Sequence, residues 1–358
     1  MDKTRVQRLM SSLALSGHEA VLLLNPSNIF YLSGYTGEGA LLISNASCAV
    51  ITDFRYTEQA EKQSPNFTVY MTGKDQTEEA VVNALCEKFQ IREIYFESDA
   101  ITVKAFEKYQ ATVKGIAWKP LTGEVEALRE IKDVGELALI EKACLITSES
   151  FERILPQIQE GISEKELAVA LEFDMRRHGA DKMAFSTIVA AGVNGSLPHA
   201  VPSNYKIRRG DMITMDFGAK VGGYCADMTR TVALGEPSSE MKKVYQTVKE
   251  AQEMAQNAVM AGKSCKEIDS IARDHINAKG YEGRFGHGLG HSLGIDIHES
   301  PRLNTQTETL LRPGHLVTVE PGIYLPGVGG VRIENTVIVT ETGCRALTLP
   351  TRELIILS

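Results

Sequence analysis

The chain has 358 residues, more than one ordinary domain usually holds, so we expect two domains. Its hydrophobic fraction of 43% and charged fraction of 23% are typical of a soluble globular protein. The net charge of −8 and the lack of a basic run argue against nucleic acid or an anionic membrane as a partner. Six cysteines are scattered without a close pair, which favours reduced thiols and a cytoplasmic location over a disulfide framework.

The N-terminal stretch MDKTRVQRLMSSLALSGHEA has the pattern of an amphipathic helix with charges throughout. It lacks the apolar core of a signal peptide, and no apolar run in the chain is long enough to span a bilayer. We therefore expect no membrane association.

Residues 1–125 alternate helical stretches with five short β runs, which read AVLLL, ALLIS, CAVIT, FTVYM and EIYFE. This alternation indicates an α/β domain. The charged helical stretch LTGEVEALREIK follows it, so we place the domain boundary there and expect a second domain over residues 126–358.

The second domain contains an internal repeat. The segment GISEKELAVALEFDMRRHGA, which begins at residue 161, resembles GKSCKEIDSIARDHINAKGY, which begins at residue 262. Identical residues recur at an offset of 101 positions: Gly161 and Gly262, Ser163 and Ser264, Glu166 and Glu267, Gly179 and Gly280. A helical stretch precedes each copy and a β-hairpin pattern follows it. The domain is therefore predicted to consist of two helix–helix–hairpin halves, an α+β arrangement.

The first hairpin carries two acidic residues, Asp216 and Asp227, among apolar neighbours. A two-residue turn at Val221–Gly222 puts them directly opposite each other, whereas a turn at Gly222–Gly223 makes them diagonal neighbours. Both registers leave the two carboxylates on one face, roughly 5 to 8 Å apart at Cβ. Such a buried pair is unfavourable unless a cation compensates it.

The second hairpin repeats the arrangement with Glu320 and Glu334, so each half offers one acid before its turn and one after it. The run FGHGLGHSLGIDIHES adds three of the eight histidines of the chain. His291 follows glycines that let the backbone and a metal approach closely. Four carboxylates and one imidazole predict a site for two divalent ions, which can share a nucleophilic water. We expect Mn²⁺, with Co²⁺, Fe²⁺ or Zn²⁺ as alternatives, because the ligands are mostly oxygen atoms.

These stretches resemble the aminopeptidase P and prolidase branch of the pita-bread metallopeptidases, over the whole chain. The segments that carry the resemblance are SLPHAVPS (196–203), MDFGAKVGGYCADMTRT (215–231), HGLGHSLGIDIHESP (287–301) and TVEPGIYLPGVGGVRIEN (318–335). The resemblance implies a creatinase-like α/β N-terminal domain followed by a pita-bread catalytic domain. It also implies a homodimeric enzyme that hydrolyses the Xaa-Pro bond at the N-terminus of proline-containing peptides.

The resemblance further implies which residues act. The implied metal ligands are Asp216, Asp227, His291, Glu320 and Glu334, with Asp227 and Glu334 bridging the two ions.

Four more positions match functional residues of the family, and Glu320 matches a second role. His199 and His298 correspond to histidines that hydrogen-bond the scissile carbonyl and the developing gem-diolate. Glu320 corresponds to the acid that moves a proton from the bridging water to the leaving nitrogen. His287 corresponds to a histidine near the substrate pocket, and Arg332 to an arginine beside the metal-binding aspartates.

Three related classes fit less well. Methionine aminopeptidase shares the ligand set but usually lacks a full N-terminal α/β domain. Creatinase does not use this metal set, and a metal-free binding module would not need it, so five filled ligand positions count against both.

Between the two Xaa-Pro enzymes, we favour an aminopeptidase P, which accepts longer peptides, over a prolidase, which is restricted to dipeptides. A prolidase needs a cation near the pocket for the free carboxylate of proline. Arg332 is expected to be engaged at the metal centre, and Arg284 and Arg302 flank the histidine run in directions that the sequence does not define.

The remaining aromatic and histidine side chains suggest no site. Tyr324 is expected to be a packing aromatic. His18, His178, His275 and His315 have no partner pattern and are expected at the surface.

Overall fold

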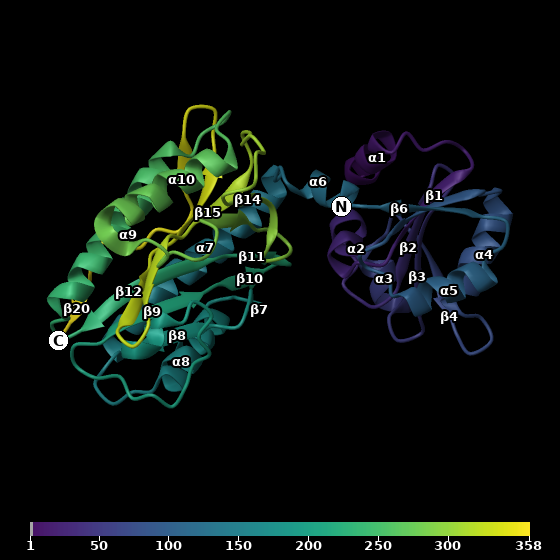
Figure 1. The fold of residues 1–358 in the computed structure, drawn as a ribbon. Helices are drawn as coiled ribbons and strands as arrows, with labels where there is room; N and C mark the ends of the chain where they lie inside the picture. The colour runs from purple at the N-terminus through teal and green to yellow at the C-terminus, as the bar shows by residue number, and fades with distance from the viewer. Residues whose placement is uncertain (1–2) are drawn as a thin grey trace. The chain divides into compact units, whose positions relative to one another are not determined.

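The computed structural model describes residues 3–358 (Figure 1). By its internal contacts the chain divides into two units, the first of which ends at Arg129 while the second runs over Glu130–Ser358. The predicted N-terminal helix is present as α1, Lys3–Ser12, and the first two residues of that prediction, Met1 and Asp2, lie outside the described residues.

The first unit is built on a six-stranded mixed sheet with the order β4-β3-β2-β1-β5-β6. The β1–β2 and β2–β3 pairs are antiparallel, and the other neighbours are parallel. Its strands are β1 (Glu19–Leu23), β2 (Ala40–Ser44), β3 (Cys48–Asp53), β4 (Thr68–Thr72), β5 (Glu93–Glu97) and β6 (Ala117–Leu121). Its other helices are α2 (Pro26–Ser33), α3 (Thr57–Gln63), α4 (Glu78–Phe89), α5 (Val103–Thr112) and α6 (Glu124–Arg129). The five predicted β runs are all strands of this sheet.

The sixth strand, β6, was not predicted. Its sequence AWKPL contains Pro120, which cannot donate a backbone hydrogen bond. β6 lies at the edge of the sheet, beside β5 alone, where such a residue is tolerated.

The second unit has the predicted duplicated organisation. In each half two helices precede a hairpin: α7 (Val134–Ile154) and α8 (Glu164–Arg177) in the first, α9 (Ser239–Ala258) and α10 (Cys265–Ile276) in the second. Ser163 begins α8 and Ser264 begins α10, each as an N-cap that forms a reciprocal capping box with the glutamate three residues on. Each box satisfies two backbone N–H groups at the start of its helix. The repeated Ser and Glu positions therefore have the same structural role in both halves.

The first hairpin lies in a four-stranded sheet with the order β20-β12-β9-β8 and continues into β10 and β11. The strands of this half are β7 (Lys182–Met183), β8 (Ile188–Ala191), β9 (Met212–Phe217), β10 (Ala219–Val221), β11 (Tyr224–Cys225) and β12 (Met228–Leu234), with β20 (Ile356–Leu357) added from the C-terminus. Val221 pairs with Tyr224, so Gly222–Gly223 form the turn, with φ values of 55° and 87°. Both turn residues need positive φ, which glycine adopts without strain.

This turn selects the second of the two registers that the sequence left open. Asp216 pairs with Thr229, and Asp227 is therefore its diagonal neighbour. The strand passes from β9 into β10 at Gly218, where an added Cβ would lie 1.8 Å from the carbonyl oxygen of Ala226. Only glycine allows the two strands to approach so closely beside the aspartates.

The second half places its acids directly opposite each other. β15 pairs with β18 and β16 pairs with β17 in one continuous register, which puts Glu320 across from Glu334 in the gap between the two ladders. Before this hairpin, β13 pairs with β14, and His291 lies opposite Arg302. The strands of this half are β13 (Gly290–Ser292), β14 (Glu299–Leu303), β15 (Leu316–Val319), β16 (Gly322–Leu325), β17 (Gly329–Arg332), β18 (Asn335–Val339) and β19 (Cys344–Ala346).

The short helical turns are η1 (Leu155–Gln157), η2 (Gly192–Ser196) and η3 (Asn277–Tyr281). Across residues 3–358, none of the helices is both long and apolar enough to cross a membrane.

Candidate metal centre

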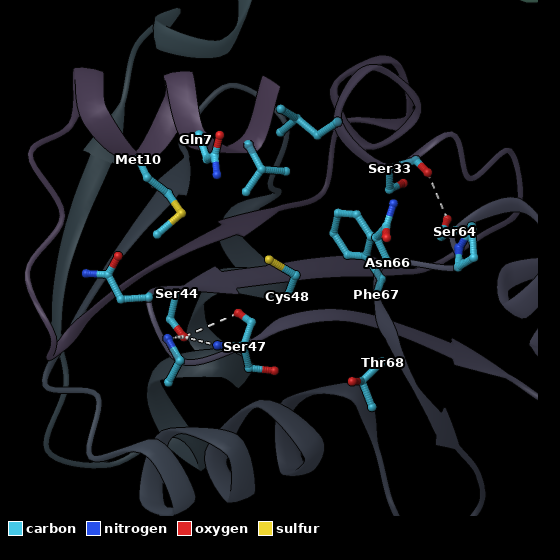
Figure 2. Close-up of a pocket in the computed structure, with 15 residues that line it drawn as sticks. Gln7, Met10, Ser33, Ser44, Ser47, Cys48, Ser64, Asn66, Phe67 and Thr68 are labelled. Atoms are coloured by element: carbon cyan, nitrogen blue, oxygen red, sulfur yellow. Dashed lines mark hydrogen bonds between the residues drawn. The ribbon is translucent and has the colours of Figure 1, made fainter. Parts of the chain in front are cut away.

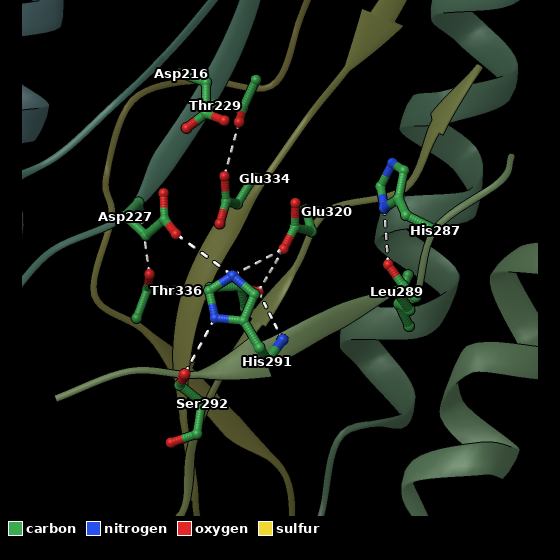
Figure 3. A network of polar contacts seen from close by, with 12 residues as sticks. Asp216, Asp227, Thr229, His287, Leu289, His291, Ser292, Glu320, Glu334 and Thr336 are labelled. Carbon is green, nitrogen blue, oxygen red and sulfur yellow. Dashed lines mark hydrogen bonds and ion pairs between the residues drawn. The ribbon is translucent and has the colours of Figure 1, made fainter. Parts of the chain in front are cut away.

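The two hairpins and β13 bring the five predicted ligands together (Figure 3). Carboxylate oxygens of Asp216, Asp227 and Glu334 lie within 4.8 Å of one another. His291 Nε2 lies 3.2 Å from Glu320 Oε1 and 3.6 Å from Asp227 Oδ2. Each half of the duplication therefore contributes two acids to one cluster, and the imidazole joins the acids of both halves.

The backbone fixes the orientation of the His291 ring. Its Nδ1 lies 3.0 Å from the carbonyl oxygen of Ser292, which can only accept a hydrogen bond, so Nδ1 carries the proton. In the neutral ring, the lone pair of Nε2 is then directed at the carboxylates. This tautomer is the one that a metal-ligating histidine needs.

The four carboxyl groups do not share one electrostatic environment. Burial, together with the charges of neighbouring carboxylates, raises the pKa of Asp227 and of Glu334 well above the ordinary values. Burial also raises the pKa of Asp216, although the guanidinium of Arg332 opposes the shift. Burial acts in the same direction on Glu320, but when the His291 ring carries a proton on both nitrogens, its hydrogen bond and charge outweigh burial and lower the pKa of Glu320 to about 2. The centre thus accumulates more negative charge than its protein partners neutralise.

The donor atoms of the cluster fit divalent cations. Within the described residues, Asp216 Oδ1 and Glu334 Oε1 are buried and have no hydrogen-bond partner. Leaving a buried charged acceptor unsatisfied costs several kcal/mol unless a cation compensates it. Divalent cations would satisfy both oxygens and would remove the repulsion that raises the pKa values of Asp227 and Glu334.

Side chains around the cluster hold the carboxylates in place. Arg332 donates from Nη2 to Asp216 Oδ2 at 2.5 Å and from Nε to the Thr229 hydroxyl at 3.1 Å. The Thr229 hydroxyl donates in turn to Glu334 Oε2 at 2.7 Å. Arg332 therefore lies beside Asp216, one of the predicted metal ligands, and it couples the acids of both halves.

Two threonines escaped the sequence analysis. Besides Thr229, Thr318 donates to Glu320 Oε1 at 3.0 Å and accepts from the backbone N–H of His291, also at 3.0 Å. Both threonines lie in the segments that suggested the hairpins, two positions from an acid, so a search for hydroxyl side chains near those acids would have found them.

Tyr324 was expected to be a packing aromatic, and its ring is buried and contacts His287, but its hydroxyl also has polar partners. Its hydroxyl accepts from Arg332 Nη1 at 3.0 Å and lies 2.9 Å from His287 Nε2. His287 Nδ1 lies 2.8 Å from the Gly288 carbonyl and so carries the proton, which leaves Nε2 to accept from Tyr324. A chain of hydrogen bonds therefore runs from Asp216, a candidate metal ligand, through Arg332 and Tyr324 to His287 in the pocket wall.

A pocket of about 380 Å³ opens onto the cluster. His199, His287 and His298 line it, together with Arg302 and Asn304. Burial lowers the pKa of His298, and the neighbouring cationic groups lower it further. The predicted substrate-facing histidines therefore lie in the same pocket as four of the candidate metal ligands.

Of the two arginines that flank the histidine run, only Arg302 lines this pocket, and Arg284 does not. His315, which was expected at the surface, is fully buried, and its Nδ1 accepts from the backbone N–H of Arg312 at 3.1 Å. His18 and His178 are exposed as expected, and His275 is partly buried with Nε2 at 3.0 Å from Glu250 Oε2.

The first unit has a pocket of its own, of about 470 Å³, between α1, the end of β2 and the starts of β3 and β4 (Figure 2). Its wall is made of apolar side chains, hydroxyls, amides and the Cys48 thiol, without an acid, a base or a histidine among its described lining residues. It therefore offers no carboxylate or imidazole for metal binding or proton transfer.

Comparisons with known proteins show which family has this sequence and fold. The chain matches Metallopeptidase family M24 over residues 138–341 and the Creatinase/Prolidase N-terminal domain over residues 5–131. It is 35% identical to the Xaa-Pro dipeptidase of Pyrococcus furiosus over 355 residues, which cover 99% of this chain and all of that protein.

Solved structures of Xaa-Pro peptidases are also similar to this chain. The Xaa-Pro dipeptidase from Bacillus anthracis superposes with a TM-score of 0.95 at 41% identity, covering 99% of both chains. The X-Pro aminopeptidase from Thermotoga maritima has a TM-score of 0.90 at 38% identity, covering 97% of this chain and 99% of that one.

A duplicated α+β scaffold that gathers four carboxylates and one imidazole into one cluster beside a pocket defines a metal-dependent peptidase of the pita-bread type. The chain belongs to metallopeptidase family M24, with a creatinase-like N-terminal domain. The predicted family and the predicted architecture are both confirmed.

Proposed function

We propose that this protein is a dinuclear metal-dependent peptidase that hydrolyses Xaa-Pro dipeptides. The observation that carries the proposal is a single pocket lined by Arg302 and by four of the five candidate metal ligands, with the fifth, Glu334, beside Asp216 and Asp227. Relatives named as Xaa-Pro dipeptidases, from Pyrococcus furiosus and Bacillus anthracis, support the choice of substrate.

In this proposal Asp216, Asp227, His291, Glu320 and Glu334 would hold two divalent ions. The oxygen-rich ligand set favours Mn²⁺, with Co²⁺, Fe²⁺ or Zn²⁺ as alternatives. When bound, the ions lower the pKa of a water molecule and polarise the scissile carbonyl.

The chain's own groups supply the proton transfers and the charge stabilisation. Hydrolysis adds a water oxygen to the carbonyl carbon, and the prolyl nitrogen must gain a proton before the C–N bond breaks. Glu320 lies 3.2 Å from His291 within the cluster, and as a carboxylate it can accept the proton of the water and deliver it to that nitrogen. His199 and His298 line the pocket and are placed to donate hydrogen bonds to the carbonyl oxygen as negative charge develops on it.

Arg302 supports a dipeptide over a longer peptide. It lies opposite His291 in the β13–β14 ladder, so the two side chains extend from the same face towards the metal ligands. The other arginine of the pocket, Arg332, is engaged by Asp216, Tyr324 and the Pro198 carbonyl. The guanidinium of Arg302 has no protein partner among the described residues, and a planar fork of N–H donors matches a free carboxylate.

The aminopeptidase reading that we favoured from the sequence remains the second candidate. It is supported by the similarity to the X-Pro aminopeptidase of Thermotoga maritima. The dipeptidase is preferred because Arg302 supplies the cation that the sequence analysis could not place, and because named dipeptidases stand among the similar proteins.

Steady-state kinetics on matched substrates test the proposal. Xaa-Pro, Xaa-Pro-amide and Xaa-Pro-Yaa are compared on the wild-type enzyme, on Arg302→Leu and on the control Arg284→Leu, which removes an exposed cation outside the pocket. We expect a preference for the free dipeptide that Arg302→Leu lowers by roughly 10- to 100-fold, the value of a charge-assisted hydrogen bond, and that Arg284→Leu leaves unchanged. Equal or faster cleavage of Xaa-Pro-Yaa by the wild-type enzyme would favour the aminopeptidase instead.

We also propose a cytoplasmic homodimer. The six free cysteines support a reducing compartment.

A further inference from the structure

The loop that carries His298 is fixed by a buried ion pair that belongs to neither the metal cluster nor the pocket wall. Lys132 Nζ donates to Glu299 Oε2 at 2.7 Å, and the two side chains are only 1% and 7% exposed. Glu299 directly follows His298 in the chain. A buried ion pair is costly to desolvate and contributes little net stability, so its presence beside a proposed catalytic residue calls for another role.

Glu299 organises the loop from inside. Its second oxygen, Oε1, accepts from the backbone N–H of Asp296 at 3.1 Å, and the Asp296 carbonyl accepts from the N–H of Gly294 at 3.0 Å. The carboxylate packs against Gly294, where an added Cβ would lie 2.7 Å from Glu299 Oε2. One carboxylate thus joins both ends of the segment 294–299.

Lys132 is itself held by a rigid part of the fold. Its backbone N–H donates to the carbonyl of Gly314 at 3.2 Å, and the preceding Ile131 forms an isolated bridge with His315. Residues 314 and 315 lead directly into β15, which ends beside Glu320. Through these contacts, Lys132 links the His298 loop to β15, the strand that ends beside the candidate ligand Glu320.

The other end of the loop is held by hydrogen bonds to the first hairpin. The N–H of Cys225 donates to the Gly294 carbonyl at 2.7 Å, and Lys220 Nζ donates to the Ile295 carbonyl. These contacts hold the start of the loop, whereas the Lys132–Glu299 pair holds its end, next to His298.

We propose that Lys132 and Glu299 are positioning residues that set the location of His298 relative to the metal centre. The inference rests on the proposed function, because it acts through the role given there to His298. A displacement of about 1 Å in a catalytic group can lower kcat as much as 10²-fold, and the effect falls on kcat because the hydrogen bond from His298 strengthens only in the transition state.

A double-mutant cycle on kcat for an Xaa-Pro dipeptide tests the proposal. Lys132→Met keeps the length of the stem and removes the charge, and it is made in the wild-type enzyme and in His298→Ala. We expect it to lower the wild-type kcat roughly tenfold or more, with metal content unchanged, and to lower the kcat of His298→Ala by less than about twofold.

Two further variants keep the result interpretable. Gly294→Ala displaces the Glu299 carboxylate from the other side without any change of charge, and it should reproduce the loss of kcat if Lys132→Met does not fold. Arg153→Met breaks a partly buried ion pair with Asp174, between α7 and α8, and controls for a general loss of stability. It should leave kcat unchanged.

The outcomes separate the two proposals. An equal loss of kcat from Lys132→Met in both backgrounds, a loss of metal, or no loss of kcat from either Lys132→Met or Gly294→Ala would overturn the positioning role. Full activity of His298→Ala itself would instead overturn the role of His298 in the proposed function.

Discussion

Replacing Glu334 by glutamine should stabilise the metal-free protein. Two unit charges 4.8 Å apart, the upper limit of the separations among Asp216, Asp227 and Glu334, repel each other by about 3 kcal/mol at an effective dielectric constant of about 20. Glu334 faces two such carboxylates, but uptake of a proton by the cluster relieves part of the repulsion. We therefore expect Glu334→Gln to gain about 2–3 kcal/mol in the free energy of unfolding without metal.

The gain should be visible in thermal unfolding. For a unit of the size of Glu130–Ser358, 1 kcal/mol corresponds to a shift of about 2–4 °C in Tm, so Glu334→Gln should unfold roughly 5–10 °C above the wild type in a chelating buffer. With excess Mn²⁺ the order should reverse, because the wild type gains binding free energy that the variant cannot.

The sign of the pH dependence follows from the raised pKa of Glu334. At a pH below the ordinary glutamate value, both the folded and the unfolded chain bind the proton, and Glu334 costs no stability. As the pH rises towards the raised pKa, the unfolded chain releases a proton that the folded cluster retains, so the wild type loses stability. The advantage of Glu334→Gln in chelator should therefore be larger at pH 8 than at pH 5.

A buried glutamate outside the cluster provides the control. Glu164 is buried and accepts hydrogen bonds from the backbone N–H groups of Ala191 and Ser203 and from the Ser203 hydroxyl. Because these donors already satisfy it, Glu164→Gln should destabilise the protein to the same extent with and without metal. A metal-free Glu334→Gln protein that unfolds below the wild type would refute the electrostatic reasoning.

The other predictions concern activity and assembly. His298→Ala should lower kcat roughly 10²–10³-fold while the metal content measured by elemental analysis stays at two ions per chain, and loss of metal would show that His298 is a ligand. Tyr324→Phe should raise KM or lower kcat by less than about 10²-fold, since it removes the two hydrogen bonds that link Arg332 to His287, and unchanged kinetics would mean that the chain of hydrogen bonds does not act on the substrate. Light scattering should return about twice the chain mass of 39.2 kDa, and the mass of a single chain at working concentration would reject the homodimer.

The parts of the site that the sequence predicted are those specified by local patterns. The hairpin acids appear because the turn and the strand period relate residues only about a dozen positions apart. The two registers of the first hairpin could not be separated, because Val221–Gly222 and Gly222–Gly223 both offer glycine, and the choice depends on a turn in which both residues have positive φ. The repeat was visible because Ser163 and Ser264 cap equivalent helices.

The parts that escaped depend on contacts between distant positions. Lys132 and Glu299 are 167 positions apart, and nothing near either residue indicates the other. Tyr324 looked like a packing aromatic because its partners, Arg332 and His287, reach it only after the second hairpin and the histidine run have folded together. His315 is buried, and its Nδ1 accepts a hydrogen bond from the backbone N–H of Arg312. The composition of the loop reveals neither the burial nor this contact.

Arg302 shows the same limitation for specificity. Its charge was evident in the sequence, but its direction depends on the pairing of β13 with β14, which places it opposite His291. Only this pairing separates Arg302 from Arg284 as the candidate receptor for a substrate carboxylate.

Metal titration of the metal-free enzyme tests the central claim most directly. The protein is stripped with a chelator and titrated with Mn²⁺, while bound metal per chain and hydrolysis of an Xaa-Pro dipeptide are measured on the same samples. The structure predicts no hydrolysis by the metal-free enzyme and a plateau in activity when two ions are bound per chain. Full hydrolysis without metal, or binding of two ions without any cleavage of Xaa-Pro substrates, would contradict the account.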